Sequence, residues 1–99
     1  MSTAARWQKN PILAWREIDG ETIIISPGDN VMHELNETGS FIWRQIDGRS
    51  SAEEIAGQLA AEYEVAPEEA LMDTETILQQ LAARQLLVAA GAAAGGAAR

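Results

Sequence analysis

The hydrophobic pattern changes character along the chain: short β-rich runs fill the first third, and helical spacing follows. Residues 12–18 and 21–26 are rich in Ile, Trp and Thr, and such runs favour strands. Asp19-Gly20 lies between them and predicts a two-residue hairpin, because a type I′ turn needs positive φ at both central residues. The second run carries consecutive isoleucines at 23–25. A strand that is apolar on both faces is typical of a central position in a sheet.

A third strand is predicted after a turn cluster at residues 26–30. Its two faces carry Val31, His33 and Leu35 on one side and Met32 and Glu34 on the other. As the last strand of a meander, it has one edge without a partner, and residues 31–36 contain no proline or lysine to protect that edge. The sequence therefore predicts an edge that can accept a further strand.

This strand is expected to pass directly into a helix over 37–47. Asn36 is a suitable N-cap, because its side chain can accept a hydrogen bond from the first turn. Glu37 adds an acid where the helix dipole favours one. Gly48 is the expected stop, since glycine adopts the left-handed conformation that often ends helices. Trp43 borders the apolar face and is expected to belong to the core.

Two further helices are predicted over 51–64 and 67–85. The first begins with a capping box, for which Ser50 is expected to be the N-cap and Glu53 its partner. Pro67 suits the first position of the last helix. The apolar residues expected to be buried together are Leu35, Ile42, Ile55, Leu59 and Leu81.

These elements predict an α+β fold, a three-stranded antiparallel sheet followed by three helices. A helix, a tight turn and a second helix within 37–65 are also typical of winged helix-turn-helix domains. One domain over 11–88 is expected, because 99 residues suffice for a single core. Residues 1–10 lack periodicity, and the Ala/Gly-rich residues 89–99 can bury little, so both ends are expected to be flexible.

Composition narrows the class of partner. The formal net charge is -8, and the seven basic residues are scattered among 15 acids. Binding to nucleic acid or to anionic membranes relies on clustered Lys and Arg, so a cationic or amphipathic peptide fits better. The sequence has no apolar run of about 18 residues for a membrane span and no signal-peptide pattern at its start. The cytoplasm is the expected compartment.

Candidate catalytic chemistry is sparse. The chain has no cysteine, which excludes disulfides and thiolate metal ligands. His33 is the single histidine and has no constellation of nucleophile or second histidine around it, so a structural or surface role is expected. The carboxylates stand where helix caps and solvated faces place them, and no glycine loop suits a phosphate. The sequence therefore favours a non-enzyme without metal or cofactor.

Short motifs follow one another in order over roughly residues 11–88. They are Leu35-Asn-Glu-Thr-Gly-Ser-Phe-Ile-Trp43, Ile46-Asp-Gly48, Glu54-Ile55, Leu59, Tyr63, Val65, Asp73 and Leu81. In this order and spacing the chain resembles the PqqD-like family, the small peptide chaperones named for coenzyme PQQ synthesis protein D. One departure is that Ile46 stands where members of PqqD proper tend to carry a cysteine. This departure weakens a link to PQQ itself.

The resemblance implies a winged helix-turn-helix domain that no longer binds DNA and recognises ribosomally made precursor peptides. In the family, the leader segment of the precursor adds as a strand to the third strand and tucks apolar side chains against the third helix. The peptide-binding residues that the resemblance implies here are Val31, Met32, His33, Glu34, Leu35, Asp73, Ile77, Leu81 and Arg84. Ile77 and Leu81 have equal claims as core residues.

The expected partners are thus a leader peptide and a modifying enzyme, either a radical SAM maturase or a leader peptidase. The chain itself has no SAM or iron–sulfur motif, so the chemistry would belong to that enzyme. The alternatives are a winged-helix DNA-binding domain, which acids on the last two helices argue against, and a structural or oligomerisation module. An open strand edge can also pair with a second copy, so we expect a monomer or a weak homodimer whose contact competes with the leader.

Overall fold

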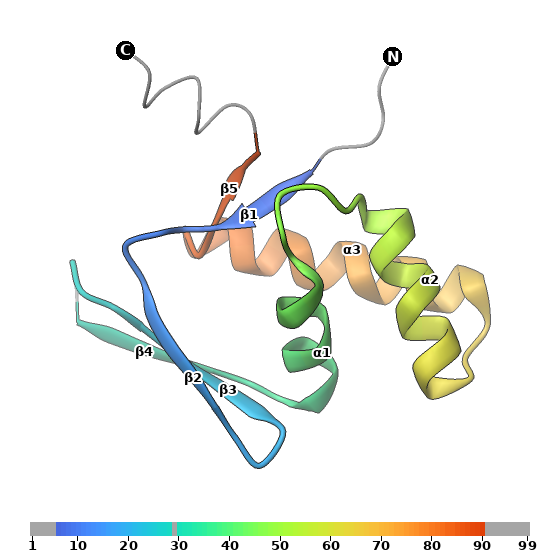
Figure 1. The fold of residues 1–99 in the computed structure, drawn as a ribbon, viewed down its shortest axis with the longest axis horizontal. Coiled ribbons are helices and arrows are strands. Elements are labelled where there is room, and N and C mark those ends of the chain that lie inside the picture. The colour runs from blue at the N-terminus through green and yellow to red at the C-terminus, as the bar shows by residue number, and fades with distance from the viewer. Residues whose placement is uncertain (1–5, 29, 91–99) are drawn as a thin grey trace.

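The computed structural model describes residues 6–28 and 30–90 of the chain. The elements in chain order are β1 (Trp7–Lys9), β2 (Ala14–Ile18), β3 (Glu21–Ser26), β4 (Val31–Leu35), α1 (Glu37–Gln45), α2 (Ala52–Tyr63), α3 (Pro67–Ala83) and β5 (Leu87–Ala89). Figure 1 shows their arrangement. The predicted α+β fold is confirmed: β2, β3 and β4 form an antiparallel sheet in that order, and the helices follow it.

The β2–β3 hairpin closes through the predicted type I′ turn. Ile18 pairs with Glu21, which leaves Asp19 and Gly20 as the loop. Both loop residues have positive φ, 53° and 83°, as this turn requires. The short turn fixes the register of the hairpin and makes β3 the central strand, as the consecutive isoleucines predicted.

The core lies on one face of the three-stranded sheet. α1 packs against β3 and β4, and the helices lie on the same side of this sheet in Figure 1. Ile24 of β3 and Ile42 and Trp43 of α1 are fully buried, so the expectation that Trp43 is a core residue is confirmed. α2 and α3 pack on each other and complete the core. All of the residues expected to be buried together belong to it: Leu35, Ile42, Ile55, Leu59 and Leu81.

Residues 7–9 form a strand, which corrects the expectation of a flexible N-terminus over 1–10. β1 pairs antiparallel with β5, with Gln8 opposite Val88. The Nζ of Lys9 donates a hydrogen bond to the carbonyl of Ile46 at 2.8 Å and lies 5.3 Å from the ring centres of Trp15 and Trp43. Burial lowers the pKa of Lys9, and the charge of Asp47 partly opposes this shift. Residues 1–5 and 91–99, also expected to be flexible, lie outside the described residues.

α3 ends at Ala83, two residues before the predicted end. The backbone N–H of Arg84 donates to the carbonyls of Gln80 and Leu81 at 3.2 Å, and Gln85 takes a positive φ of 63°. The chain therefore turns, and the buried Leu87 begins β5 instead of extending the helix. The last domain residues pair with β1, so the tail begins later than the predicted residue 89.

The capping box of α2 lies one residue later than predicted. Ser51, not Ser50, is the N-cap: its Oγ accepts from the N–H of Glu54 at 3.2 Å, and its own N–H donates to the Glu54 carboxylate at 2.8 Å. Consecutive serines face consecutive glutamates, so the sequence fits both registers. The structure uses the later one because the N–H of Ser50 is already bonded to Asp47 at 2.9 Å.

Replacing Leu59 by alanine should lower the free energy of unfolding by about 2–5 kcal/mol, the range for emptying a core position. The Leu59 side chain is 2% exposed in the core between α2 and its neighbours. Urea unfolding measures the loss. Met72 of α3 is 68% exposed, so Met72→Ala is the matched control and should change stability little. Equal losses in the two variants would contradict this description of the core.

Asp47→Ala should destabilise the protein near neutral pH and less in acid. The backbone N–H groups of Arg49 and Ser50 donate to Asp47 at 2.8 and 2.9 Å, and these bonds lower the pKa of its carboxyl below the ordinary 3.8. A lowered pKa gives stability that is complete above the unfolded value and is lost as pH falls through the folded one. The difference in thermal midpoint between wild type and variant should therefore shrink below pH 3.8. Asp47→Asn, which keeps an acceptor but does not titrate, serves as the control; a pH-independent difference for Asp47→Ala would contradict the prediction.

Candidate functional site

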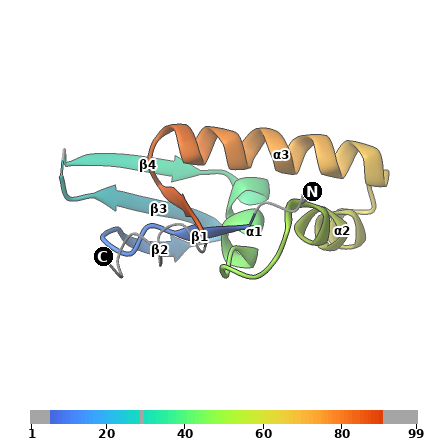
Figure 2. The ribbon, with the colours of Figure 1, turned by 90° about the horizontal axis from the view of Figure 1, so that it is seen from above.

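A pocket lies between the edge strand β4 and the C-terminal half of α3. Figure 2 shows α3 running along the side of the sheet where β4 is the last strand. The pocket has a volume of about 270 Å³ and is lined by Glu34, Leu35, Asn36, Gly39, Ile77, Gln80, Leu81 and Arg84. The structure thus brings together five of the residues that the family resemblance implied: Glu34, Leu35, Ile77, Leu81 and Arg84.

The strand side of the pocket is held by the junction of β4 with α1. The Asn36 side chain accepts from the N–H of Gly39 at 2.9 Å, which confirms Asn36 as the predicted N-cap. The hydroxyl of Ser40 donates to the carbonyl of Leu35 at 3.2 Å, and Thr22 of β3 donates to Ser40 at 2.8 Å. Ser40 and Thr22 are fully buried. This buried chain of bonds fixes the end of β4 relative to both the sheet and the helix.

The hairpin register determines which backbone groups of β4 face the open edge. In a two-residue hairpin the residues that flank the loop exchange hydrogen bonds, so Ile23 and Ile25 bond toward β2 and the alternate residues of β3 bond toward β4. Val31, His33 and Leu35, which pair with those alternate residues, therefore bond to β3. The N–H and C=O groups of the remaining β4 residues, Met32 and Glu34, point away from the sheet. No described strand pairs with this edge.

The helix side of the pocket combines core and surface residues. Leu81 is 1% exposed and belongs to the core, while its position in the lining makes it the floor of the pocket. Ile77 lies one turn before Leu81 on α3, is half-buried, and packs against the core. Gln80 and Arg84 are exposed at the rim. Ile77 and Leu81 thus pack with the core and also line the pocket, and their part in peptide binding stays a prediction.

The other predicted residues lie beyond the pocket. Val31, Met32 and His33 continue β4 away from it, with Val31 and Met32 exposed and His33 half-buried. Asp73 is exposed on α3 one turn before Ile77, outside the lining. These residues extend the site along the strand and along the helix, and their part in binding stays a prediction.

Charge is distributed unevenly along this site. Glu34 stands on the strand side of the pocket and Arg84 on the helix side. From residue 52 to residue 75 the two helices carry only acids among their charged residues: Glu53, Glu54, Glu62, Glu64, Glu68, Glu69, Asp73 and Glu75. A chain lying in the pocket would meet an acid and a base there, and only acids further toward the start of α3.

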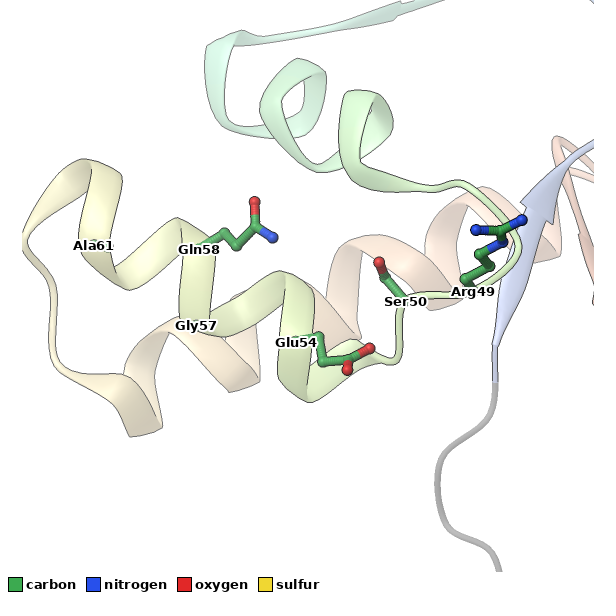
Figure 3. Close-up of a pocket in the computed structure, with 6 residues that line it drawn as sticks. All are labelled: Arg49, Ser50, Glu54, Gly57, Gln58 and Ala61. Atoms are coloured by element: carbon green, nitrogen blue, oxygen red, sulfur yellow. The ribbon is translucent and has the colours of Figure 1, made fainter.

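A second hollow, near the start of α2, offers no comparable chemistry. Figure 3 shows its lining of Arg49, Ser50, Glu54, Gly57, Gln58 and Ala61. The Glu54 carboxylate is bonded in the capping box, and Ser50 is bonded to Asp47. Within residues 6–28 and 30–90, no group of His, Asp and Glu could hold a metal ion, and no helix could cross a membrane.

Sequence reasoning missed Asn36, Gly39 and Gln80 as pocket residues. A side chain at Gly39 would place its Cβ 3.3 Å from both Leu35 Cβ and Asn36 Oδ1, so glycine keeps this wall of the pocket low. The signal was the Thr38-Gly39 pair in the first turn of a helix, where glycine costs stability relative to alanine. Gln80 could have been predicted from helical spacing, since it lies three residues after Ile77 and four before Arg84, on the same face of the helix.

These features define a winged helix-turn-helix-like domain whose candidate site combines an open strand edge and a pocket. The family model described as coenzyme PQQ synthesis protein D (PqqD) matches residues 21–87, and the chain belongs to this family. The resemblance drawn from the motifs is therefore confirmed. β1 and most of β5 lie outside the matched residues.

Two solved structures have the same fold. The chain described as TbiB1 in complex with the TbiA(beta) leader peptide is 26% identical, with a TM-score of 0.74 over 81% of this chain and 93% of that one. A lasso peptide synthetase B1 complexed with the leader peptide is 20% identical, with a TM-score of 0.76 over 85% of this chain and 99% of that one. Curated protein sequences gave no match.

Proposed function

We propose that this protein binds the leader segment of a ribosomally synthesised precursor peptide as an added strand along β4. One observation carries the proposal: the outward backbone groups of Met32 and Glu34 lie beside the pocket between β4, α1 and α3. In strand addition, main-chain hydrogen bonds supply affinity and side-chain pockets supply specificity. Both parts are present here and adjoin each other at Glu34 and Leu35.

Similar proteins support this proposal. The TbiB1 chain was solved with a leader peptide bound, and it shares the fold of this chain over most of its length. Membership of the PqqD family points in the same direction. The leader would place an apolar side chain against Leu35, Ile77 and Leu81, with neighbouring residues near Glu34 and Arg84. Val31, His33 and Asp73 would extend the contact on either side.

The protein would hold the leader while another protein modifies the precursor. PqqD-like leader-binding domains are usually non-catalytic, so we propose a chaperone rather than an enzyme. The partner would be a radical SAM maturase or a leader peptidase, in the cytoplasm where precursors are synthesised. The free protein would be a monomer or a weak homodimer. A winged-helix DNA-binding role is disfavoured by the acids of α2 and α3, and a gel-retardation assay on random duplex at low salt tests it.

Met32→Pro should fold but bind the leader at least about tenfold more weakly, because it removes an edge donor worth roughly 0.5–1.5 kcal/mol and its ring obstructs the added strand. The N–H of Met32 points away from β3, so the native sheet loses no hydrogen bond. Isothermal titration with the cognate leader peptide measures the change. Met32→Ala retains the N–H and should bind nearly as wild type. If Met32→Pro folds and binds as tightly as wild type, the leader does not add to this edge.

Ile77→Asp should weaken leader binding by a factor of about ten or more, because it puts a charge into the apolar part of the pocket without a partner. Gln79→Asp is the matched control, since it adds the same charge at an exposed position of α3 outside the lining. Thermal unfolding of both variants checks that the fold persists. Similar affinities for the two variants would remove the pocket from the proposal and leave strand addition standing.

A further inference from the structure

The three-stranded sheet has an outer face that no described element covers. In Figure 1 the helices lie on the other side of this sheet. Exposed apolar side chains occur on each of the strands here: Ile18 of β2 is 48% exposed, Ile25 of β3 is 42% and Met32 of β4 is 58%. A shallow hollow of about 300 Å³ lies at its β2–β3 side, lined by Ala14, Trp15, Arg16, Ile23 and Ile25. Exposed apolar patches of this kind mark interaction surfaces.

The outer face is ordered in rows across the strands. Residues paired across an antiparallel sheet point to the same side, so the strand register defines each row. One row consists of Arg16, Ile23 and Glu34, and the next consists of Ala14, Ile25 and Met32. Each row has an isoleucine in the middle. The first has opposite charges at its ends, and the second has a small and a large side chain at its ends.

We propose that this outer face is the contact between two copies of this chain, related by a two-fold axis parallel to β3. Such an axis lays β3 on β3 and places β2 of each copy over β4 of the other, with the rows kept in line. Arg16 then faces Glu34 of the other copy, and the symmetry repeats this pair. Ala14 faces Met32 of the other copy, so a small side chain opposes a large one. Glu21, the next outward residue of β3, would face Glu21 of the other copy on the axis, so two Arg16–Glu34 pairs are set against one contact between like charges. The two rows themselves are complementary to their copies.

The other two-fold arrangement lacks this complementarity. A two-fold axis that runs across the strands, through the row of Arg16, Ile23 and Glu34, lays β2 on β2 and β4 on β4. Arg16 would then oppose Arg16 and Glu34 would oppose Glu34, and like charges held together are unfavourable. The charge pattern therefore selects one orientation of the two copies. Neither residue forms a salt bridge within the part of the chain that the structure describes, so both charges are available.

The contact is small, so the dimer should be weak. Three strands about 4.8 Å apart and about 17 Å long give a flat footprint of roughly 250 Å² per copy, below the ~800 Å² of stable complexes. The dimer leaves the backbone edge of β4 and the α3 side of the pocket uncovered. Glu34 is shared, because its side chain lies on the outer face and also lines the pocket. This arrangement differs from edge-to-edge pairing, which would compete with a leader. The two kinds of dimer can therefore be separated by experiment.

Sedimentation velocity from micromolar to millimolar concentration at about 0.1 M salt tests the proposal on the full chain, because this salt screens the repulsion between two copies of net charge -8. The wild type should associate reversibly. Arg16→Glu and Glu34→Arg should each reduce association about twofold or more, as expected from exposed pairs of roughly 0.2–1 kcal/mol that occur twice. The double variant Arg16→Glu with Glu34→Arg should restore it. Arg49→Glu and Glu75→Arg make the same charge changes away from the face and should leave it unchanged.

Several outcomes would overturn the proposal. A wild type that remains monomeric to millimolar concentration would assign the face to another partner. A double variant as weak as the singles would exclude the Arg16–Glu34 contact. Dissociation by saturating leader would show that copies pair through the β4 edge instead. Leader titration of Arg16→Glu is measured separately and should match wild type, so a failure of this proposal is distinguishable from a failure of leader binding.

Discussion

The position of β4 depends on the buried hydrogen bonds at its junction with α1. Thr22 donates to Ser40, and Ser40 donates to the carbonyl of Leu35, while Asn36 caps the helix. Both hydroxyls are fully buried, where an unpaired polar group would cost about 1–3 kcal/mol. Breaking one of these hydrogen bonds would therefore leave a buried polar group unpaired and would weaken the whole junction. They place the end of an edge strand at the start of a helix, and the pocket lies where these two elements meet α3.

Local signals were sufficient to predict most of the fold. Asp19-Gly20, Asn36 and Pro67 each determine the conformation of their own neighbourhood, and each occupies its predicted role. The two serines and two glutamates at the start of α2 allowed two registers, and a local bond from the N–H of Ser50 to Asp47, three residues earlier, decided between them. β1 and β5 were missed for a different reason. A strand of three residues is too short to show an alternation of apolar and polar residues. β1 and β5 are also stabilised by pairing between opposite ends of the chain.

The candidate site was predictable as a set of elements but not as a cavity. The open edge of β4 followed from the order of the strands, and Ile77, Leu81 and Arg84 followed from the family resemblance. Asn36 and Gly39 were assigned only to the helix cap, because their second role appears when α3 packs beside them. The separation of Val31 and Asp73 from the pocket likewise depends on where α3 crosses the sheet. The spacing of residues along the sequence does not show how α3 is oriented relative to the sheet.

The hairpin loop at Asp19-Gly20 is exposed and lies outside the pocket, yet its length sets the register of β2 against β3. Strand pairing has a period of two, so inserting or deleting one loop residue shifts one strand against the next by one position. Such a change would exchange the inward and outward faces of β2 while leaving every residue of the pocket in place. Mutational drift in this loop is therefore restricted in number, and also in kind, to residues that accept positive φ. Among relatives, this exposed loop should exchange Asn, Asp and Gly far more readily than it gains or loses a residue.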